Sequence, residues 1–161
     1  MTIRLLQATD AESYWNLRLE SLKENPEAFA TTYEESMQQV ANNLETAGSF
    51  TFGAFKNDKL IGIVTVLQEK RLKLQHRGVI VSMYVTPSQR NSGIGQALLK
   101  ETLKKAKELN LEQITLTVLT DNKPAKALYE SMEFQTFGIE KKALKYKEQY
   151  FDEEFMVLEC P

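Results

Sequence analysis

The chain has 161 residues, of which 42% are hydrophobic and 26% charged, with a formal net charge of −2. This length predicts one domain over residues 1–161, and the near-neutral charge argues against nucleic acid as the main ligand. The sequence contains no run of roughly 18 apolar residues, so we expect no membrane-spanning segment. No signal peptide is apparent, and one cysteine, Cys160, suits a reducing environment, so we expect a cytoplasmic protein.

The first half of the chain predicts two helices and four strands. Asp10 is placed to cap a helix that ends near Glu24, because Pro26 cannot continue it, and a weaker helical pattern covers residues 33–44. The strand segments are rich in aromatic and β-branched residues, and a polar turn at 56–59 joins two of them into a hairpin. The expected strands are residues 2–7, 50–55, 60–67 and 79–86.

The second half opens with the clearest helix, from Gly93 to about Leu109, which has leucines on one face and lysines on the other. An alternating strand is expected at 112–119, followed by a helix that Asp121 and Asn122 open. Closing strands are expected at 134–137 and 154–158. The lysine-rich stretches 100–107 and 141–147 are interpreted as solvated helix or loop faces. This order predicts one mixed α/β sheet with helices on its faces.

A polar turn with two glycines precedes the clearest helix. Unpaired N–H groups and the helix dipole favour an anion at such a helix start, and Gly93 and Gly95 would let a phosphate or pyrophosphate approach the backbone. A P-loop is excluded because Gln96 follows where lysine is needed, and a dinucleotide fingerprint is excluded because Leu98 stands where a small residue is needed. A turn of purely structural purpose would show the same glycines.

Two motifs resemble the GCN5-related N-acetyltransferase (GNAT) superfamily. The family's pyrophosphate motif, Gln/Arg-x-x-Gly-x-Gly/Ala after Val-x-Pro, is matched by Arg90–Gly95 after Val85-Thr86-Pro87. Its second motif, an Asn with Ala three residues on and then Leu-Tyr, is matched by the segment from Asn122 to Tyr129. The resemblance covers nearly the whole chain in element order and specific residues from about Ser82 to Phe134.

The resemblance implies a fold of the α/β (α+β) class. Its single, largely antiparallel central sheet would have about six to seven strands, with a splayed fourth and fifth strand and helices on both faces. It also implies an acetyl-CoA-dependent N-acetyltransferase that acetylates a primary amine of a small molecule or peptide directly, without a metal. A non-catalytic acyl-CoA-binding sensor or interaction module is the alternative. Some family members pair through sheet edges or closing strands, which leaves a homodimer open, although no exposed apolar stripe is evident in the sequence.

The motif matches also imply roles for individual residues. The backbone of Met83, Tyr84 and Val85 would pair with the pantetheine arm. Asn122 would hydrogen-bond the cofactor and Tyr129 would act as general acid at its sulfur, although a helix cap and a packed aromatic are the structural alternatives for these two. The backbone amides that would hold the pyrophosphate belong to Arg90, Asn91, Ser92, Gly93, Ile94, Gly95 and Gln96.

The acceptor side is much less defined by the sequence. Candidates to line it are Phe29, Tyr33, Glu34, Tyr150 and Asp152. Candidates for a general base are Glu34, Glu35, Asp152 and Glu153, although the favoured interpretation of each carboxylate alone is a solvated surface position. If these carboxylates surround the acceptor, they would favour a cationic amine such as a polyamine. One departure from the family is Glu133 where glycine is usual, which predicts either strain or a different helix end.

Overall fold

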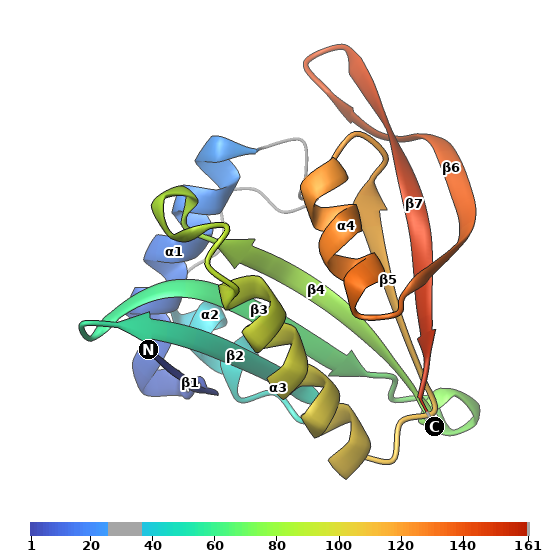
Figure 1. The fold of residues 1–161 in the computed structure, drawn as a ribbon. Coiled ribbons are helices and arrows are strands. Elements are labelled where there is room, and N and C mark those ends of the chain that lie inside the picture. The colour runs from blue at the N-terminus through green and yellow to red at the C-terminus, as the bar shows by residue number, and fades with distance from the viewer. Residues whose placement is uncertain (26–36, 161) are drawn as a thin grey trace.

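The computed structural model describes residues 1–25 and 37–160. Figure 1 shows a single sheet with helices packed against both of its faces. The strands are β1 (Thr2–Leu5), β2 (Ser49–Lys56), β3 (Lys59–Gln68), β4 (Arg77–Val85), β5 (Gln113–Leu119), β6 (Gln135–Tyr146) and β7 (Gln149–Glu159). The helices are α1 (Ala11–Glu24), α2 (Met37–Leu44), α3 (Ile94–Glu108) and α4 (Lys123–Ser131), with short 3-10 turns at Ala8–Asp10, Leu72–Leu74 and Pro87–Gln89.

The seven strands lie in the order β1-β2-β3-β4-β5-β7-β6. Neighbouring strands are antiparallel except β4 and β5, which run parallel. That pair is in register only from Arg77 opposite Gln113 to Val79 opposite Thr115. Beyond Val79 the two strands diverge, as Figure 1 shows. The predicted mixed sheet with a splayed fourth and fifth strand is therefore confirmed.

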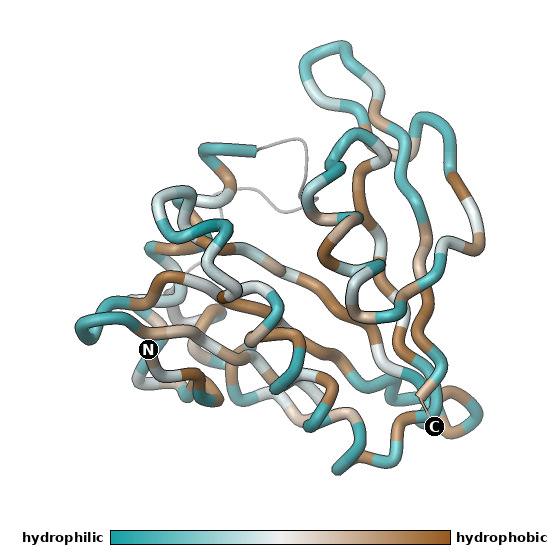
Figure 2. Tube along the Cα trace, viewed as in Figure 1, coloured by the Kyte–Doolittle hydropathy of each residue, from teal (hydrophilic) through white to brown (hydrophobic). Residues whose placement is uncertain are grey.

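Two hydrophobic cores hold the helices on opposite faces of the sheet. α3 and α4 share one core, in which Leu98 and Leu99 are fully buried. α1 and α2 share the other, where Leu17 and Val40 pack with Tyr84 of β4. Figure 2 shows hydrophobic residues along the strands and hydrophilic ones at the outer tip of the β6–β7 hairpin. The splayed end of β4 is thus enclosed by helices from both sides.

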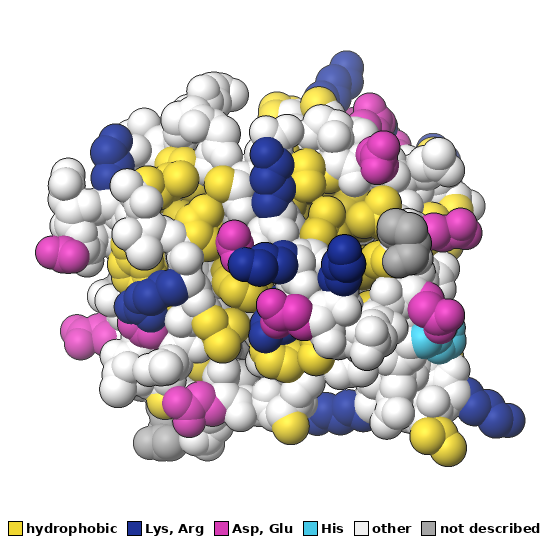
Figure 3. Space-filling model, turned by 60° about the horizontal axis from the view of Figure 1, so that its bottom comes forward, with side chains coloured by type: hydrophobic (Ala, Val, Ile, Leu, Met, Phe, Trp, Pro, Cys, Tyr) yellow, Lys and Arg dark blue, Asp and Glu magenta, His cyan; other side chains and the backbone are white. Residues whose placement is uncertain are grey.

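The lysines of α3 lie on its outer side, as the helical period predicts. Lys100, Lys104 and Lys107 are exposed, whereas Lys105 is partly buried with its ammonium 5.2 Å from the centre of the Phe50 ring. Figure 3 shows lysine and arginine side chains among apolar ones on the face that carries this helix. The interpretation of residues 100–107 as a solvated helix face is confirmed.

The second lysine-rich stretch is mostly exposed, as expected, but it is not a helix or loop. Residues 141–147 belong mainly to strand β6, which with β7 is longer than the sequence pattern indicated. β6 is an edge strand, exposed along most of its length, so its sequence carries no alternation of buried and exposed residues. The lysine-rich end of β6 is held in the sheet by pairing with β7, from Leu144 opposite Phe151 to Tyr146 opposite Gln149. Phe137 and Ile139 of this strand are exposed apolar residues that the sequence did not single out.

Asp10 stands directly before α1 but does not cap it. Its carboxylate instead accepts hydrogen bonds from the N–H of Gln7 (2.8 Å) and from the guanidinium of Arg4 (2.8 and 2.9 Å). The competing partner, Arg4, lies on the preceding strand, and a rule that considers only the helix does not include it.

Within the two described ranges, no helix has the length and apolar character to cross a membrane.

Candidate functional site

The turn between β4 and α3 presents a row of unused backbone donors. Pro87–Gln89 form a 3-10 turn, Asn91 adopts φ 61°, and Gly93 precedes α3 with φ 83° in the left-handed region. Among the described residues, no protein group accepts a hydrogen bond from the N–H groups of residues 91–96. Donors at a helix start that lack a partner favour a bound anion, so the chemistry of this turn fits a pyrophosphate.

The two glycines of this turn have different physical roles. A β-carbon on Gly93 would meet no atom within 4 Å, so this glycine is needed for its positive φ and leaves the backbone open. A β-carbon on Gly95 would lie 3.0 Å from Cδ2 of Leu128 and 3.2 Å from Cε of Met83. Gly95 therefore lets the start of α3 approach α4 and β4, a packing role that the sequence did not reveal.

The side chains of the turn face the protein more than an outside ligand. The guanidinium of Arg90 donates to the carbonyl of Val85 (2.8 Å) and to Glu24 of α1. The hydroxyl of Ser92 donates to the carbonyl of Gln89 (2.6 Å), and Ile94 is buried in the core. The expected contribution of these residues to cofactor binding thus falls on their backbone.

β4 contains a bulge at its splayed end. Ile63 of β3 is opposite Tyr84 and Thr65 is opposite Val81, so Ser82 and Met83 both face a single β3 residue. Ser82 has φ 57°, which is unusual for a residue other than glycine. The bulge directs Met83 toward α3 and Tyr84 toward α1. Its only sequence signal is a serine within an otherwise apolar run.

The second motif lies on α4, beside the first. The side-chain oxygen of Asn122 accepts from the N–H of Ala125 (3.3 Å), so this residue is the helix cap that its position predicted. Tyr129 is buried, with its ring edge-on to Phe134 at 6.0 Å between ring centres. Burial raises the pKa of the Tyr129 phenol above its ordinary value, so the hydroxyl stays protonated at neutral pH.

The usual glycine after α4 is replaced by a strained residue. Glu133 has φ 71°, its N–H bonds the carbonyl of Glu130, and the N–H of Phe134 bonds the carbonyl of Tyr129. These two bonds make a Schellman cap, the arrangement in which glycine is preferred. Of the two outcomes that the sequence left open, strain at Glu133 is the one observed.

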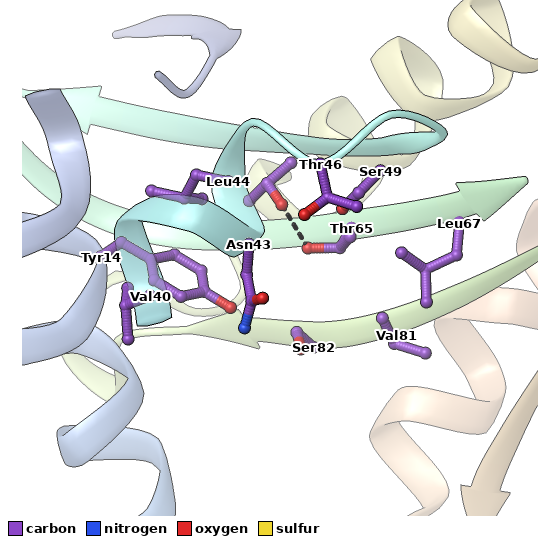
Figure 4. A pocket seen from close by; sticks show the side chains of 11 residues that line it. Tyr14, Val40, Asn43, Leu44, Thr46, Ser49, Thr65, Leu67, Val81 and Ser82 are labelled. Carbon is purple, nitrogen blue, oxygen red and sulfur yellow. Dashed lines mark hydrogen bonds between the residues drawn. The ribbon is translucent and has the colours of Figure 1, made fainter. Parts of the chain in front are cut away.

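A cavity of about 260 Å3 lies on the α1–α2 face of the sheet. Figure 4 shows Tyr14 and Asn43 reaching toward Ser82 of the β4 bulge, with a hydrogen bond between Thr51 and Thr65 (2.6 Å) nearby. The described lining side chains are hydroxyls, one amide and aliphatic groups, without a carboxylate or a cation: Tyr14, Val40, Asn43, Leu44, Thr46, Ser49, Thr51, Thr65, Leu67, Val81 and Ser82. The sequence had indicated none of these residues for an acceptor site.

The predicted acceptor residues are only partly located. Phe29, Tyr33, Glu34 and Glu35 lie outside the described residues. The carboxylate of Asp152 accepts from the N–H of Lys142 (2.8 Å) and pairs with the ammonium of Lys141 (3.2 Å), where it holds an irregular part of β6.

Two further candidates lie on β7. The exposed ring of Tyr150 makes cation–π contacts with the ammonium groups of Lys142 and Lys145. Glu153 lies opposite Leu119 and Glu140 in the sheet. Neither residue, nor Asp152, is among the described residues that line the cavity.

The splayed sheet, the open helix start and the two adjoining motifs together define a GNAT-type fold. A sequence model of the acetyltransferase (GNAT) domain matches residues 3–155. The chain therefore belongs to the GNAT acetyltransferase family.

Individual relatives agree with this assignment. N-alpha-acetyltransferase 30 of Dictyostelium discoideum is 32% identical over 83 residues, which are 52% of this chain and 44% of that protein. The chain thus spans about half the length of the curated relatives that it matches.

Solved structures share the fold over nearly the full chain. A ribosomal-protein-alanine N-acetyltransferase from Brucella melitensis has a TM-score of 0.89 at 20% identity, covering 99% of this chain and 100% of that chain. A phosphinothricin acetyltransferase from Sinorhizobium meliloti in complex with AcCoA has a TM-score of 0.88 at 23% identity, covering 98% and 87%.

Proposed function

We propose that this protein is a cytoplasmic N-acetyltransferase that moves the acetyl group of acetyl-CoA directly to a primary amine. The observation that carries the proposal is the row of N–H groups at residues 91–96, beside the open end of β4 and β5. Acetyl-CoA supplies a pyrophosphate for these donors and a thioester as the acetyl source. An extended pantetheine arm would lie along Met83–Val85, where β5 no longer pairs with β4.

The transfer requires two proton movements. A bond forms between the amine nitrogen and the acetyl carbonyl carbon while the carbon–sulfur bond breaks, the amine loses a proton and the thiolate gains one. Tyr129 is the group proposed to donate a hydrogen bond to the leaving sulfur. Its pKa, raised by burial, lies above that of a thiol near ~8.5, so a hydrogen bond that stabilises the thiolate is easier than complete proton transfer.

The cavity on the α1–α2 face is the proposed acceptor site, because Val81 and Ser82 connect it to the splayed strand. Its described lining contains no carboxylate, which favours an acceptor that is already partly neutral. An α-amino group, with a pKa of about 7.7–8.0, meets this condition, whereas a lysine-like amine near ~10.4 does not. The relative from Dictyostelium discoideum is an N-alpha-acetyltransferase, which supports the same choice. We therefore favour the α-amine of a peptide or amino acid over a polyamine.

Calorimetric titration of the purified protein with acetyl-CoA is the first test, with NAD and ATP as controls. Binding of acetyl-CoA alone supports the cofactor assignment, and absence of binding contradicts it. Release of free thiol is then measured at pH 7.5 with peptides that differ only in a free or blocked N-terminus, beside spermidine. Activity that needs the free α-amine is expected. Acetylation of spermidine alone would contradict the acceptor class, and binding without any turnover would support the non-catalytic alternative.

A further inference from the structure

The last residue of α1, Glu24, is bonded to the turn that begins the candidate pyrophosphate site. Its carboxylate accepts two hydrogen bonds from the guanidinium of Arg90, at 2.9 and 3.1 Å, and one from the hydroxyl of Tyr84 at 2.5 Å. A third donor of the same guanidinium bonds the carbonyl of Val85 at 2.8 Å. Glu24 and Arg90 are 66 positions apart in the sequence, so this is a tertiary contact and not a local cap.

These bonds fix both ends of the turn. Val85 is the last residue of β4, and Arg90 follows the 3-10 turn directly before the open N–H groups. The planar guanidinium is oriented by its two bonds to Glu24, and it lies 5.3 Å from the centre of the Tyr84 ring. The turn is therefore clamped between a strand end and a helix end.

The charge state of the clamp is set by its own bonds. Burial alone would raise the pKa of the Glu24 carboxyl, but the hydrogen bonds from Tyr84 and Arg90 outweigh it and hold that pKa below its ordinary value. Glu24 is thus ionised at neutral pH and neutralises Arg90, whose side chain is 40% exposed. An arginine that served directly as a phosphate ligand would be weakened by such a neighbour.

We infer that Glu24 is a positioning residue for acetyl-CoA. Through Arg90 it holds the turn at residues 85–90 in the one arrangement that presents the N–H groups of residues 91–96 to the pyrophosphate. A binding site that is already ordered in the free protein does not spend binding free energy on ordering a loop. This inference rests on the proposed function, because it concerns how the same cofactor is bound.

The opposite change in acetyl-CoA affinity is expected if Arg90 is itself a ligand of the pyrophosphate and Glu24 holds it away. Glu24→Gln would then free the guanidinium for the pyrophosphate, and acetyl-CoA would bind more tightly. A positioning role predicts weaker binding from Glu24→Gln, and also from Arg90→Lys, which keeps the charge but lacks the fork. The direction of the change separates the two roles.

The test measures the dissociation constant of acetyl-CoA by calorimetry for the wild type, Glu24→Gln, Arg90→Lys and the double variant. We expect each single variant to raise the dissociation constant roughly tenfold. The double variant should bind acetyl-CoA no more weakly than the single variants, because both substitutions break the same Glu24–Arg90 clamp. Tyr84→Phe, which leaves the Arg90 fork in place, should weaken binding less. Arg90→Lys, which removes the fork from the other side, keeps the test usable if Glu24→Gln folds poorly.

Asp10→Asn is the matched control. It breaks another two-oxygen fork, with Arg4, on the β1 side of the molecule. A general loss of stability would affect both variants, whereas only Glu24→Gln should weaken acetyl-CoA binding and shift the amide NMR signals of residues 91–96 in the free protein. Unchanged or tighter binding by Glu24→Gln would overturn the inference. Failure of the wild type to bind acetyl-CoA would overturn the proposed function itself.

Discussion

Gly95 of α3 lies so close to Leu128 of α4 that a β-carbon on the glycine would stand 3.0 Å from Cδ2 of the leucine. Gly95→Ala should therefore destabilise the protein by about 1–2 kcal/mol through overpacking. In a Leu128→Ala background the cost should largely disappear, because the contacting atoms are gone. Urea denaturation of the four proteins measures both effects. An equal cost in both backgrounds would show that the glycine is required for another reason.

Gly93→Ala provides the contrast, since its β-carbon meets nothing within 4 Å but its φ is 83°. Gly93→Ala should lower the free energy of unfolding by roughly 1 kcal/mol, and by the same amount in the wild-type and Leu128→Ala backgrounds.

Tyr129→Phe should lower turnover by about 100-fold while leaving the affinity for acetyl-CoA nearly unchanged. The ring and its packing on Phe134 remain, and only the donor at the sulfur is lost. Because burial raises the pKa of Tyr129, the phenol is protonated throughout the range from pH 6 to 9, so the pH profiles of wild type and variant should have the same shape. Tyr146→Phe, on the exposed hairpin, is the control. Equal turnover would show that the Tyr129 hydroxyl does not stabilise the leaving thiolate.

Glu133→Gly should stabilise the protein by about 1 kcal/mol, because it removes the strain of a side chain at φ 71° from the cap of α4. Glu130→Gly, one turn earlier on the exposed side of the same helix, should destabilise by about the same amount. Thermal and urea denaturation of both variants check the pair. A loss of stability in both would mean that the carboxylate of Glu133 makes a contribution larger than the strain.

Glu154→Gln should destabilise the protein at neutral pH, and the difference from wild type should shrink as the pH falls through the acid range. The buried carboxylate accepts from Lys126 (2.8 Å) and Thr136 (3.0 Å). The hydrogen bond from Lys126 lowers the pKa of Glu154, with burial opposing it and Thr136 assisting. A carboxyl with a lowered pKa stabilises the fold above its unfolded pKa near ~4.3, and this contribution is lost as the pH falls through the folded value. A difference between wild type and variant that does not shrink on acidification would contradict this origin.

The parts of the fold that were predictable from sequence are those with a local cause. Helical periodicity located α3 to within a residue or two, and the cap at Asn122 and the turn at Gly93 followed from short-range chemistry. The two GNAT motifs then gave the sheet and its splayed pair. The positive φ at Glu133 was one of the two outcomes that the sequence left open, because a helix end of that geometry normally requires glycine.

The parts that were missed depend on distant partners. The β4 bulge is defined by register with β3, and the second half of β6 exists because β7 pairs with it. The partners of Asp152, Lys141 and Lys142 across the hairpin, were also not evident in the sequence, while its role at the acceptor site stays a prediction. The packing role of Gly95 likewise depends on Leu128 in another helix.

The short parallel ladder between β4 and β5 has a consequence for folding. On either side of it the strands are mostly joined to close neighbours in sequence, as in the β2–β3 and β6–β7 hairpins, whereas the ladder from Arg77 to Val79 must wait for α3 to cross between its strands. Local pairings form earlier than distant ones because less chain entropy is lost in closing them. Hydrogen exchange should therefore reveal two cooperative units that meet at this ladder, and the docking of one on the other should limit the rate of folding.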